Sequence, residues 1–367
     1  MDEKDIGTKV IPVLTLPMGV GGDSHSNIRA LQRLLQLLDS PELCDVIDGQ
    51  PVSKAHLGDS SGYGASPVET TNTVRKRFKV DLTGNHDKAF VELTEDHLLP
   101  QLKREDPLFG AFNDKAQEAL EWQLHVYQRA EMRGFTYYDY FRELPRMVEV
   151  NGTLLVHGSP RKPITEYIRP NYVTMPDILR KIFEQVPKAV AVAHTHFSML
   201  ILYDPKKGSN NRFYWAWGPE VVSEGVLEEL PDVVFSPDDL SEPIHANVRV
   251  LAKSKLNGYK AVINFGSIGQ PRDNCPLAKG GIITQEGYFF LRVPYDTYGA
   301  AADIIRVGLP PILGWRLIDG DERNKKANGG VRTLYETDDA FQKRFAQEMA
   351  TRGVDYPLPQ QYSSIKI

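Results

Sequence analysis

Residues 22–31 read Gly-Asp-Ser-His-Ser-Asn-Ile-Arg-Ala-Leu, so that an Asp-x-His-x-Asn cluster stands directly before a helical pattern. Leucines recur from here at helical spacing, which predicts a helix that starts near Asn27 and stops before Pro41. Carboxylate and imidazole groups in one short loop are of the type that binds divalent metals. An isolated Asp-x-His pair more often belongs to an ordinary turn, so its meaning depends on the rest of the chain.

Four more polar clusters follow, each after a strand-like apolar segment. They are Gly58-Asp59, Gly84-Asn85-His86-Asp87, Val156-His157-Gly158 and Ala193-His194-Thr195-His196. A strand is expected from Val190 to His194, and in a strand a period of two would point the rings of His194 and His196 to one face. Because ligands of open α/β sheets gather at strand ends, the order predicts one site. Oxygen and imidazole donors without thiolate suit Mn, Fe or Zn.

This combination resembles the calcineurin-like metallophosphoesterases, and in particular their bacterial and archaeal phosphodiesterase branch. The motifs that carry the resemblance are residues 23–31, Gly58-Asp59-Ser60-Ser61-Gly62-Tyr63-Gly64, Gly84-Asn85-His86, His157-Gly158-Ser159-Pro160, Ala193-His194-Thr195-His196, residues 264–272 (Asn-Phe-Gly-Ser-Ile-Gly-Gln-Pro-Arg) and Val293-Pro294-Tyr295-Asp296. The similarity covers roughly residues 10–317. It implies an α/β protein with a four-layer αββα sandwich, in which two mixed β-sheets are flanked by helices.

The resemblance also implies the roles of individual residues. One divalent ion is expected at Asp23, His25 and His196, and a second at Asn85, His157 and His194, with Asp59 bridging both. His86 resembles the residue that donates to the phosphoryl or leaving oxygen. Asp87 is expected to steer its ring, and such a pair would bias the imidazole toward the charged form. Arg161 and Arg272 could each grip a phosphate bidentately, or be solvated loop charges.

The chain departs from the family pattern at its first strand and in two of its motifs. Pro17 and three glycines interrupt the apolar run that normally precedes the first aspartate, which weakens the prediction of a strand there. The Asp-Arg pair that Ser/Thr protein phosphatases carry after their Gly-Asp is missing after Asp59. In addition, Asp87 stands where those phosphatases have Glu. The last two differences argue against a protein phosphatase.

The expected activity is hydrolysis of small phosphate esters, with phosphodiesters or nucleotides as substrates. Two ions would clamp the phosphoryl group and supply a hydroxide nucleophile at neutral pH. A phosphomonoesterase, a dinucleoside-polyphosphate hydrolase and a non-catalytic scaffold that binds a protein partner are the alternatives. Scaffolds tend to lose ligands, because nothing then preserves a costly cluster. Every expected ligand position is filled here, which favours an enzyme.

Composition limits the partners and the location. The net charge of −5 argues against a nucleic-acid groove as the main surface. No apolar run approaches the ~18 residues of a membrane span. The two cysteines lie far apart in the sequence, and the first thirty or so residues lack a signal-peptide pattern. We therefore expect free thiols and a cytoplasmic location.

The chain is predicted to divide into a catalytic domain over residues 1–317 and a C-terminal extension over residues 318–367. Phe341, Phe345 and Met349 recur at i, i+4 and i+8, which predicts an amphipathic helix over about 337–352. Its apolar stripe could dock on its own domain or contact a second copy in a homodimer, and the sequence leaves both open.

Overall fold

The computed structural model describes most of the chain. The described residues are 14–49, 53–98, 107–131, 134–206, 211–215, 227–256, 258–320, 324–327, 330–333 and 338–356. Within these ranges no helix combines the length and the apolar character needed to cross a bilayer. Cys44 and Cys275 are both free thiols.

Two mixed β-sheets of seven and six strands form the centre of the described molecule. The first has the order β3 (Val80–Asp81), β2 (Ser53–His56), β1 (Met18–Gly21), β12 (Ala278–Ile283), β13 (Gly287–Val293), β10 (Ile244–Ala252) and β9 (Glu228–Phe235). The second has the order β4 (Met147–Val150), β5 (Thr153–Val156), β6 (Ala189–Val192), β11 (Lys260–Phe265), β7 (Ser198–Tyr203) and β8 (Asn211–Trp215). Strands β14 (Asn324–Ala327) and β15 (Gly330–Thr333) form a separate pair.

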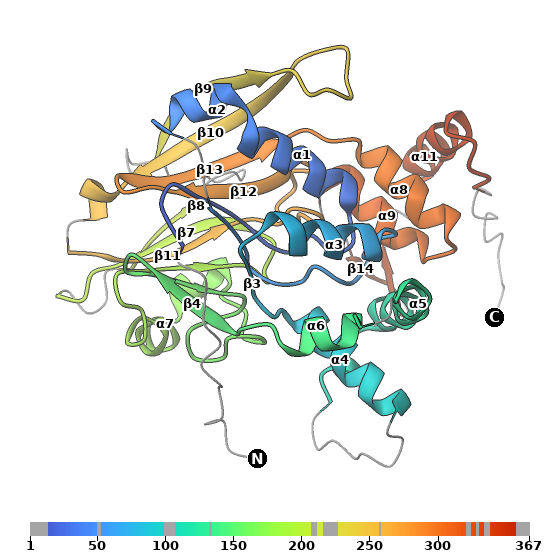
Figure 1. The fold of residues 1–367 in the computed structure, drawn as a ribbon, viewed down its shortest axis with the longest axis horizontal. Coiled ribbons are helices and arrows are strands. Elements are labelled where there is room, and N and C mark those ends of the chain that lie inside the picture. The colour runs from blue at the N-terminus through green and yellow to red at the C-terminus, as the bar shows by residue number, and fades with distance from the viewer. Residues whose placement is uncertain are drawn as a thin grey trace.

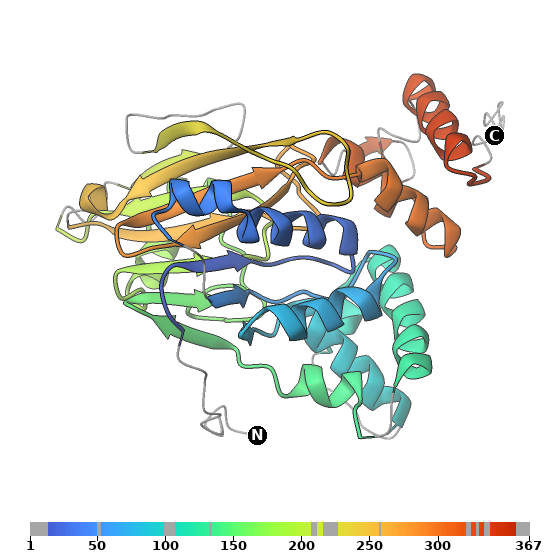
Figure 2. The same ribbon diagram turned by 45° about the horizontal axis from the view of Figure 1, so that its top comes forward.

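Helices flank the two sheets. The α-helices of the described residues are α1 (Ile28–Asp39), α2 (Pro41–Val46), α3 (Pro67–Arg77), α4 (Asn85–Leu98), α5 (Asp114–Ala130), α6 (Tyr137–Arg142), α7 (Pro176–Phe183), α8 (Thr297–Arg306), α9 (Pro311–Asp319) and α11 (Asp339–Thr351). Helix α1 packs on the seven-stranded sheet and α7 on the six-stranded sheet, so they lie on opposite sides of the sandwich (Figure 1). Helices α4, α5 and α6 gather at one end (Figure 2). The predicted αββα architecture is confirmed.

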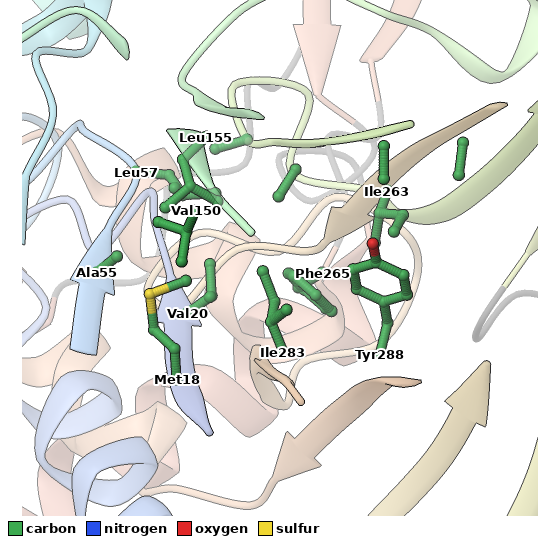
Figure 3. Close-up of a cluster of buried hydrophobic side chains, with 14 of the residues drawn as sticks. Met18, Val20, Ala55, Leu57, Val150, Leu155, Ile263, Phe265, Ile283 and Tyr288 are labelled. Atoms are coloured by element: carbon green, nitrogen blue, oxygen red, sulfur yellow. The ribbon is translucent and has the colours of Figure 1, made fainter. Parts of the chain in front are cut away.

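The main core lies between the two sheets, and strand alternation fills it from both sides. Met18 and Val20 of β1 face the same cluster as Val150 and Leu155 of the second sheet (Figure 3). The intervening side chains of the second sheet point outward, and those of β6 and β7 pack against α7. This alternation fixes the register of each strand and therefore the position of the loop that follows it.

The first strand forms despite the interrupted sequence, so the weakened prediction for this segment was wrong. Pro17 precedes β1, so it removes no hydrogen-bond donor from the ladder. The glycines within the strand allow close packing on the face that α1 covers. At Gly21, for example, an added Cβ would lie 2.7 Å from the side chain of Ile268. Strand β1 then pairs in parallel with β2 and antiparallel with β12.

The parallel strands bring the polar clusters to one edge of the sandwich. Strands β1, β2 and β3 are mutually parallel in one sheet, and β5, β6 and β11 are parallel in the other. The loops that follow them carry the residues predicted to bind metal. Since the carboxyl ends of parallel strands meet at one edge, both sheets contribute to the same site.

The C-terminal helix α11 docks on its own chain. Phe341, Phe345 and Met349 are buried in a cluster with Ala301 of α8 and Trp315 of α9. The stripe is thus filled within one chain, and a homodimer stays a prediction that another surface would have to support. Helix α9 runs past the predicted domain boundary at residue 317, and the division into two domains also stays a prediction.

Candidate metal centre

Asp23, His25 and His196 come together at the edge of the sandwich. One donor atom from each lies within 4.8 Å of the others, and all three side chains are buried. The Nε2 atoms of His25 and His196 are 3.2 Å apart, and Nε2 of His196 is 3.6 Å from Oδ1 of Asp23. This is the set expected to hold the first ion.

Asp59, His157 and His194 form a second set, with donor atoms again within 4.8 Å of one another. The side-chain oxygen of Asn85 lies 3.1 Å from Nε2 of His157 and extends this set. The structure therefore assembles the residues expected for the second ion, although they come from four separate loops.

Asp59 lies between the two sets. Its Oδ1 accepts a hydrogen bond from the backbone N–H of His86 at 2.8 Å. Its Oδ2 is buried and has no hydrogen-bond partner among the described residues. The same Oδ2 lies 3.6 Å from Nε2 of His25 and 3.5 Å from Nε2 of His157. The Oδ2 of Asp59 is therefore buried, unpartnered and close to one histidine of each set. This is the position that the expected bridging ligand needs.

In each histidine, the ring nitrogen that donates to the protein backbone leaves the other ring nitrogen free to bind metal. Nδ1 of His25 lies 2.9 Å from the carbonyl of Ser61, and Nδ1 of His157 lies 2.8 Å from that of Leu57. A carbonyl only accepts, so each Nδ1 donates and Nε2 keeps its lone pair in the neutral ring. His196 follows the same pattern through the carbonyl of Gln270.

His194 is oriented the other way. Its Nε2 donates to the carbonyl of Thr165 at 3.3 Å, which leaves the lone pair on Nδ1. Each of the four rings thus has one nitrogen that donates to a backbone carbonyl and one that is free to accept. This second layer of hydrogen bonds is typical of metal-binding histidines.

Burial disfavours every charge in this cluster. It raises the pKa of Asp23 to about 7 and that of Asp59 well above its usual value. It lowers the pKa of His157 to about 3, and the pKa values of the other three ring ligands fall well below theirs for the same reason. Divalent cations require neutral imidazoles and ionised carboxylates, and they would offset the burial of the carboxylates. The donor set fits a divalent-metal centre.

The strand predicted from Val190 to His194 ends before either His194 or His196. Strand β6 stops at Val192, and the two histidines have φ values of 65° and 61°. Left-handed backbone is incompatible with a continuing strand, so the rings do not point to one face by alternation. They face different sets instead, because the turn redirects each ring separately.

The predicted pairing of Asp87 with His86 is also wrong. Oδ2 of Asp87 accepts from the backbone N–H groups of Asp59 at 2.7 Å and Gly84 at 3.1 Å, and Oδ1 accepts from the N–H and hydroxyl of Ser61. Adjacent residues on a helix do not face each other, which separates the carboxylate from the neighbouring ring. Asp87 therefore fixes the loop that carries Asp59.

His86 is consequently neutral rather than biased toward the charged form. Burial, followed by the charge of Arg272, lowers its pKa well below the usual value. Its Nδ1 has no hydrogen-bond partner among the described residues. This nitrogen faces Gly62, where an added Cβ would overlap it. The glycine, with φ of 94°, leaves room for the ring in the middle of the cluster.

The two arginines differ in position. Arg161 pairs with the carboxylate of Glu166, which also accepts from Ser159. Arg272 lies close enough to the cluster for its charge to lower the pKa of Asp23 and of His196. Its NH2 is 3.4 Å from the hydroxyl of Tyr63. Of the two, Arg272 is the better placed to meet an anion at the centre.

Sequence reasoning missed two residues that support the ligands. Tyr167 stacks on His194, with ring centroids 3.7 Å apart and planes inclined by 20°. His56 lies outside the five polar clusters, yet its Nε2 bonds to the hydroxyl of Ser24, which stands between two of the expected ligands. Only its place directly before Leu57-Gly58-Asp59 hinted at a supporting role.

Comparisons with known proteins agree with this geometry. No family model matches the sequence. An uncharacterized protein of Methanocaldococcus jannaschii is 26% identical over 311 residues, which cover 83% of this chain and 98% of that protein. The relative's name gives no activity.

Solved structures share the fold. A metallophosphoesterase from Sphaerobacter thermophilus is 25% identical with a TM-score of 0.55, and the match covers 83% of this chain and all (100%) of that one. A hypothetical protein from Pyrococcus horikoshii has 17% identity and a TM-score of 0.52, over 85% of this chain and 99% of its own. The second likeness concerns the fold alone, whereas the first also names a class of enzyme.

Proposed function

Because the chain belongs to the calcineurin-like metallophosphoesterase superfamily, we propose that it is a metal-dependent phosphoesterase whose substrates are phosphodiesters or nucleotides. Two ions per chain are part of the proposal, with Mn, Fe or Zn as candidates. A cytoplasmic location is a further part, supported by the two free thiols.

The position of Asp59 carries the proposal. Its Oδ2 is buried without a hydrogen-bond partner among the described residues and lies between His25 of one set and His157 of the other. An isolated carboxylate oxygen in such a place would be strongly unfavourable if no cation were ever bound there. The arrangement therefore supports a bridged dinuclear site rather than two independent ones.

The residues of the site would have different roles in the reaction. When bound, a pair of divalent ions supplies a hydroxide nucleophile at neutral pH and neutralises charge on the phosphoryl group. Asp59 and the two ligand sets hold the donor geometry. The neutral His86 lies beside His25, with ring centroids 4.7 Å apart, where an N–H could donate to a phosphoryl or leaving oxygen. Arg272 adds a fixed positive charge.

The preference for diesters or nucleotides rests on the loop after Asp59. This loop continues Ser60-Ser61-Gly62 instead of the Asp-Arg pair of Ser/Thr protein phosphatases. Gly62 faces the ring of His86, where an added Cβ would lie 2.4 Å from Nδ1, so no side chain at this position can contribute a charge beside the ring. These two features support a substrate other than a phosphoprotein.

A panel of phosphate esters tests the proposal. Protein loaded with Mn²⁺ is assayed on matched monoesters, diesters, cyclic nucleotides and dinucleoside polyphosphates, and again after chelation. We expect metal-dependent turnover that is fastest on a diester or nucleotide. Fastest turnover of simple monoesters would contradict the diester preference. Metal binding without turnover of any member would support the scaffold instead.

A further inference from the structure

A chain of buried hydrogen bonds runs behind the metal centre. The hydroxyl of Ser24 lies 2.8 Å from Nε2 of His56, and Nδ1 of His56 lies 2.7 Å from Oδ1 of Asp81. The hydroxyl of Tyr140 donates to Oδ2 of Asp81 at 2.7 Å. Ser24 and His56 are both 0% exposed, and Asp81 is 8% exposed. The function proposed above assigns no role to this chain of hydrogen bonds.

Three adjacent strands place its members. In the parallel register, Gly21 of β1 is opposite His56 of β2, and His56 is opposite Asp81 of β3. The bond from His56 to Asp81 therefore joins the ends of β2 and β3, and the bond from His56 to Ser24 reaches the loop that follows β1. Strand pairing sets the spacing of His56 and Asp81.

The direction of the hydrogen bonds follows from the chemistry of each group. An ionised Asp81 only accepts, so Nδ1 of His56 donates to it. In the neutral ring Nε2 then carries the lone pair, and the hydroxyl of Ser24 donates to it. The order of Ser, His and Asp is that of a nucleophilic triad. The hydroxyl of Ser24 is bonded to His56 behind the metal centre, so we assign it to the loop that carries Asp23 and His25 rather than to a substrate.

The backbone on either side of Ser24 is left-handed. Asp23 has φ of 53° and His25 has φ of 44°, and Ser26 continues at 55°. Left-handed residues other than glycine are strained by on the order of 1–3 kcal/mol each and persist only when their surroundings hold them. The donor atoms of Asp23 and His25 turn toward His196, whereas the side chain of Ser24 is anchored on His56.

We propose that His56, held by Asp81, is a positioning residue for the first metal site and acts through the hydroxyl of Ser24. The inference rests on the proposed function, because it assumes that Asp23, His25 and His196 bind an ion. Without this anchor the strained loop could relax, and two of the three donors of that site would move. The second set lies on other loops and should be affected much less.

Metal titration tests the proposal without any substrate. Chelator-treated protein is titrated with Mn²⁺ by calorimetry, and bound metal is counted after dialysis. Ser24→Ala should weaken one of the two ions by ~10–100-fold, the range seen when residues that orient ligands are lost. The other ion should keep its affinity. His196→Ala, which removes a donor of the first site, identifies which ion is weakened.

Ser53→Ala is the matched control. Ser53 is a buried serine on the same strand as His56, and its hydroxyl bonds to Thr15 at 3.1 Å, away from the cluster. It should leave both affinities unchanged. An equal loss in Ser53→Ala, or unchanged affinities in Ser24→Ala, would overturn the proposal.

The double variant tests whether His56 acts through Ser24. If it does, adding His56→Gln to Ser24→Ala should weaken the first ion little further, because both changes remove the same bond. Additive losses would overturn the role of His56. Should His56→Gln fail to fold, Ser24→Ala alone still decides whether the anchor matters. Wild-type protein that binds no metal would instead contradict the proposed function, and this role with it.

Discussion

Oδ2 of Asp87 accepts a hydrogen bond from the backbone N–H of Asp59, with 2.7 Å between the heavy atoms. The helix that begins at Asn85 thereby holds the loop of the bridging ligand. The bond is reciprocated, because the backbone N–H of His86 donates to the side chain of Asp59. The two motifs are thus interlocked through backbone groups, which leaves Oδ2 of Asp59 free for metal.

Asp87→Asn should therefore lower stability more than the loss of a surface charge would. One oxygen becomes an amide N–H₂ group, which would face backbone donors instead of accepting from them. Leaving a buried donor unpaired costs on the order of 1–3 kcal/mol, measured as the free energy of unfolding in denaturant. The exposed Asp139→Asn is a control that should change it little. Equal effects would show that Asp87 does not fix this loop.

If Asp59 bridges the two proposed ions, Asp59→Asn removes one charge from both of them together. Activity should fall by at least ~100-fold, the scale on which preorganised charge stabilises a transition state. His125, which is exposed on α5, provides the control, and His125→Ala should keep nearly full activity. Initial rates on the best ester of the panel give the comparison. If the two variants behave alike, the site has been assigned wrongly.

His86→Ala should lower the rate while both ions stay bound, because His86 is assigned to the substrate rather than to a metal. Because its ring is neutral, His86 would donate a hydrogen bond rather than a proton, and hydrogen bonds to charged groups contribute ~1.5–3 kcal/mol, or roughly 10–100-fold in rate. The loss should shrink for nitrophenyl esters, whose leaving oxygen needs less stabilisation. Rates and bound metal are measured on the same samples. Loss of an ion would make His86 a ligand, and equal losses for good and poor leaving groups would contradict its role as a hydrogen-bond donor to the leaving oxygen.

Metal binding should release protons in a pH-dependent way. Burial raises the pKa of Asp23 to about 7, so metal-free protein holds a proton there at about pH 6, which coordination must displace. The lowered pKa values of the histidines mean that they are already neutral and contribute none. Affinity should thus rise with pH through about 7. Calorimetry in buffers of different ionisation enthalpy measures the release, and equal release at about pH 6 and about pH 8 would contradict this.

Arg272→Gln should reduce kcat/KM by about tenfold or more, since hydrogen bonds to charged groups contribute ~1.5–3 kcal/mol. Arg161→Gln should have a smaller effect, because the guanidinium of Arg161 is already engaged with Glu166. Steady-state kinetics on one ester compares the two. A larger loss in Arg161→Gln would reverse the assignment of the phosphate contact.

The sequence was sufficient to predict which residues gather at the site. Asp23, Asp59 and His157 each lie within three residues of a strand end, and a residue that close to a strand end cannot lie far from the sheet edge. The sandwich itself followed from the resemblance of these motifs to a family. Neither prediction required knowledge of contacts between distant segments.

The hydrogen-bond partners could not be predicted in the same way. Asp87 is next to His86 in sequence but bonds to Asp59, and His56 bonds to Ser24 and Asp81 across neighbouring strands. Such pairs depend on strand register and on which way a helix turns its first residues. Both are set by tertiary packing, so no local pattern in the sequence records them.

Five of the proposed ligands adopt left-handed backbone, in a conformation that glycine or asparagine would occupy more easily. They are Asp23, His25, Asp59, His194 and His196. Under selection for stability alone, these positions would be expected to drift toward Gly or Asn. In a descendant of this chain that no longer bound metal, replacing these residues would thus increase the stability of the folded state. The ligands and their strained backbone would be expected to disappear together.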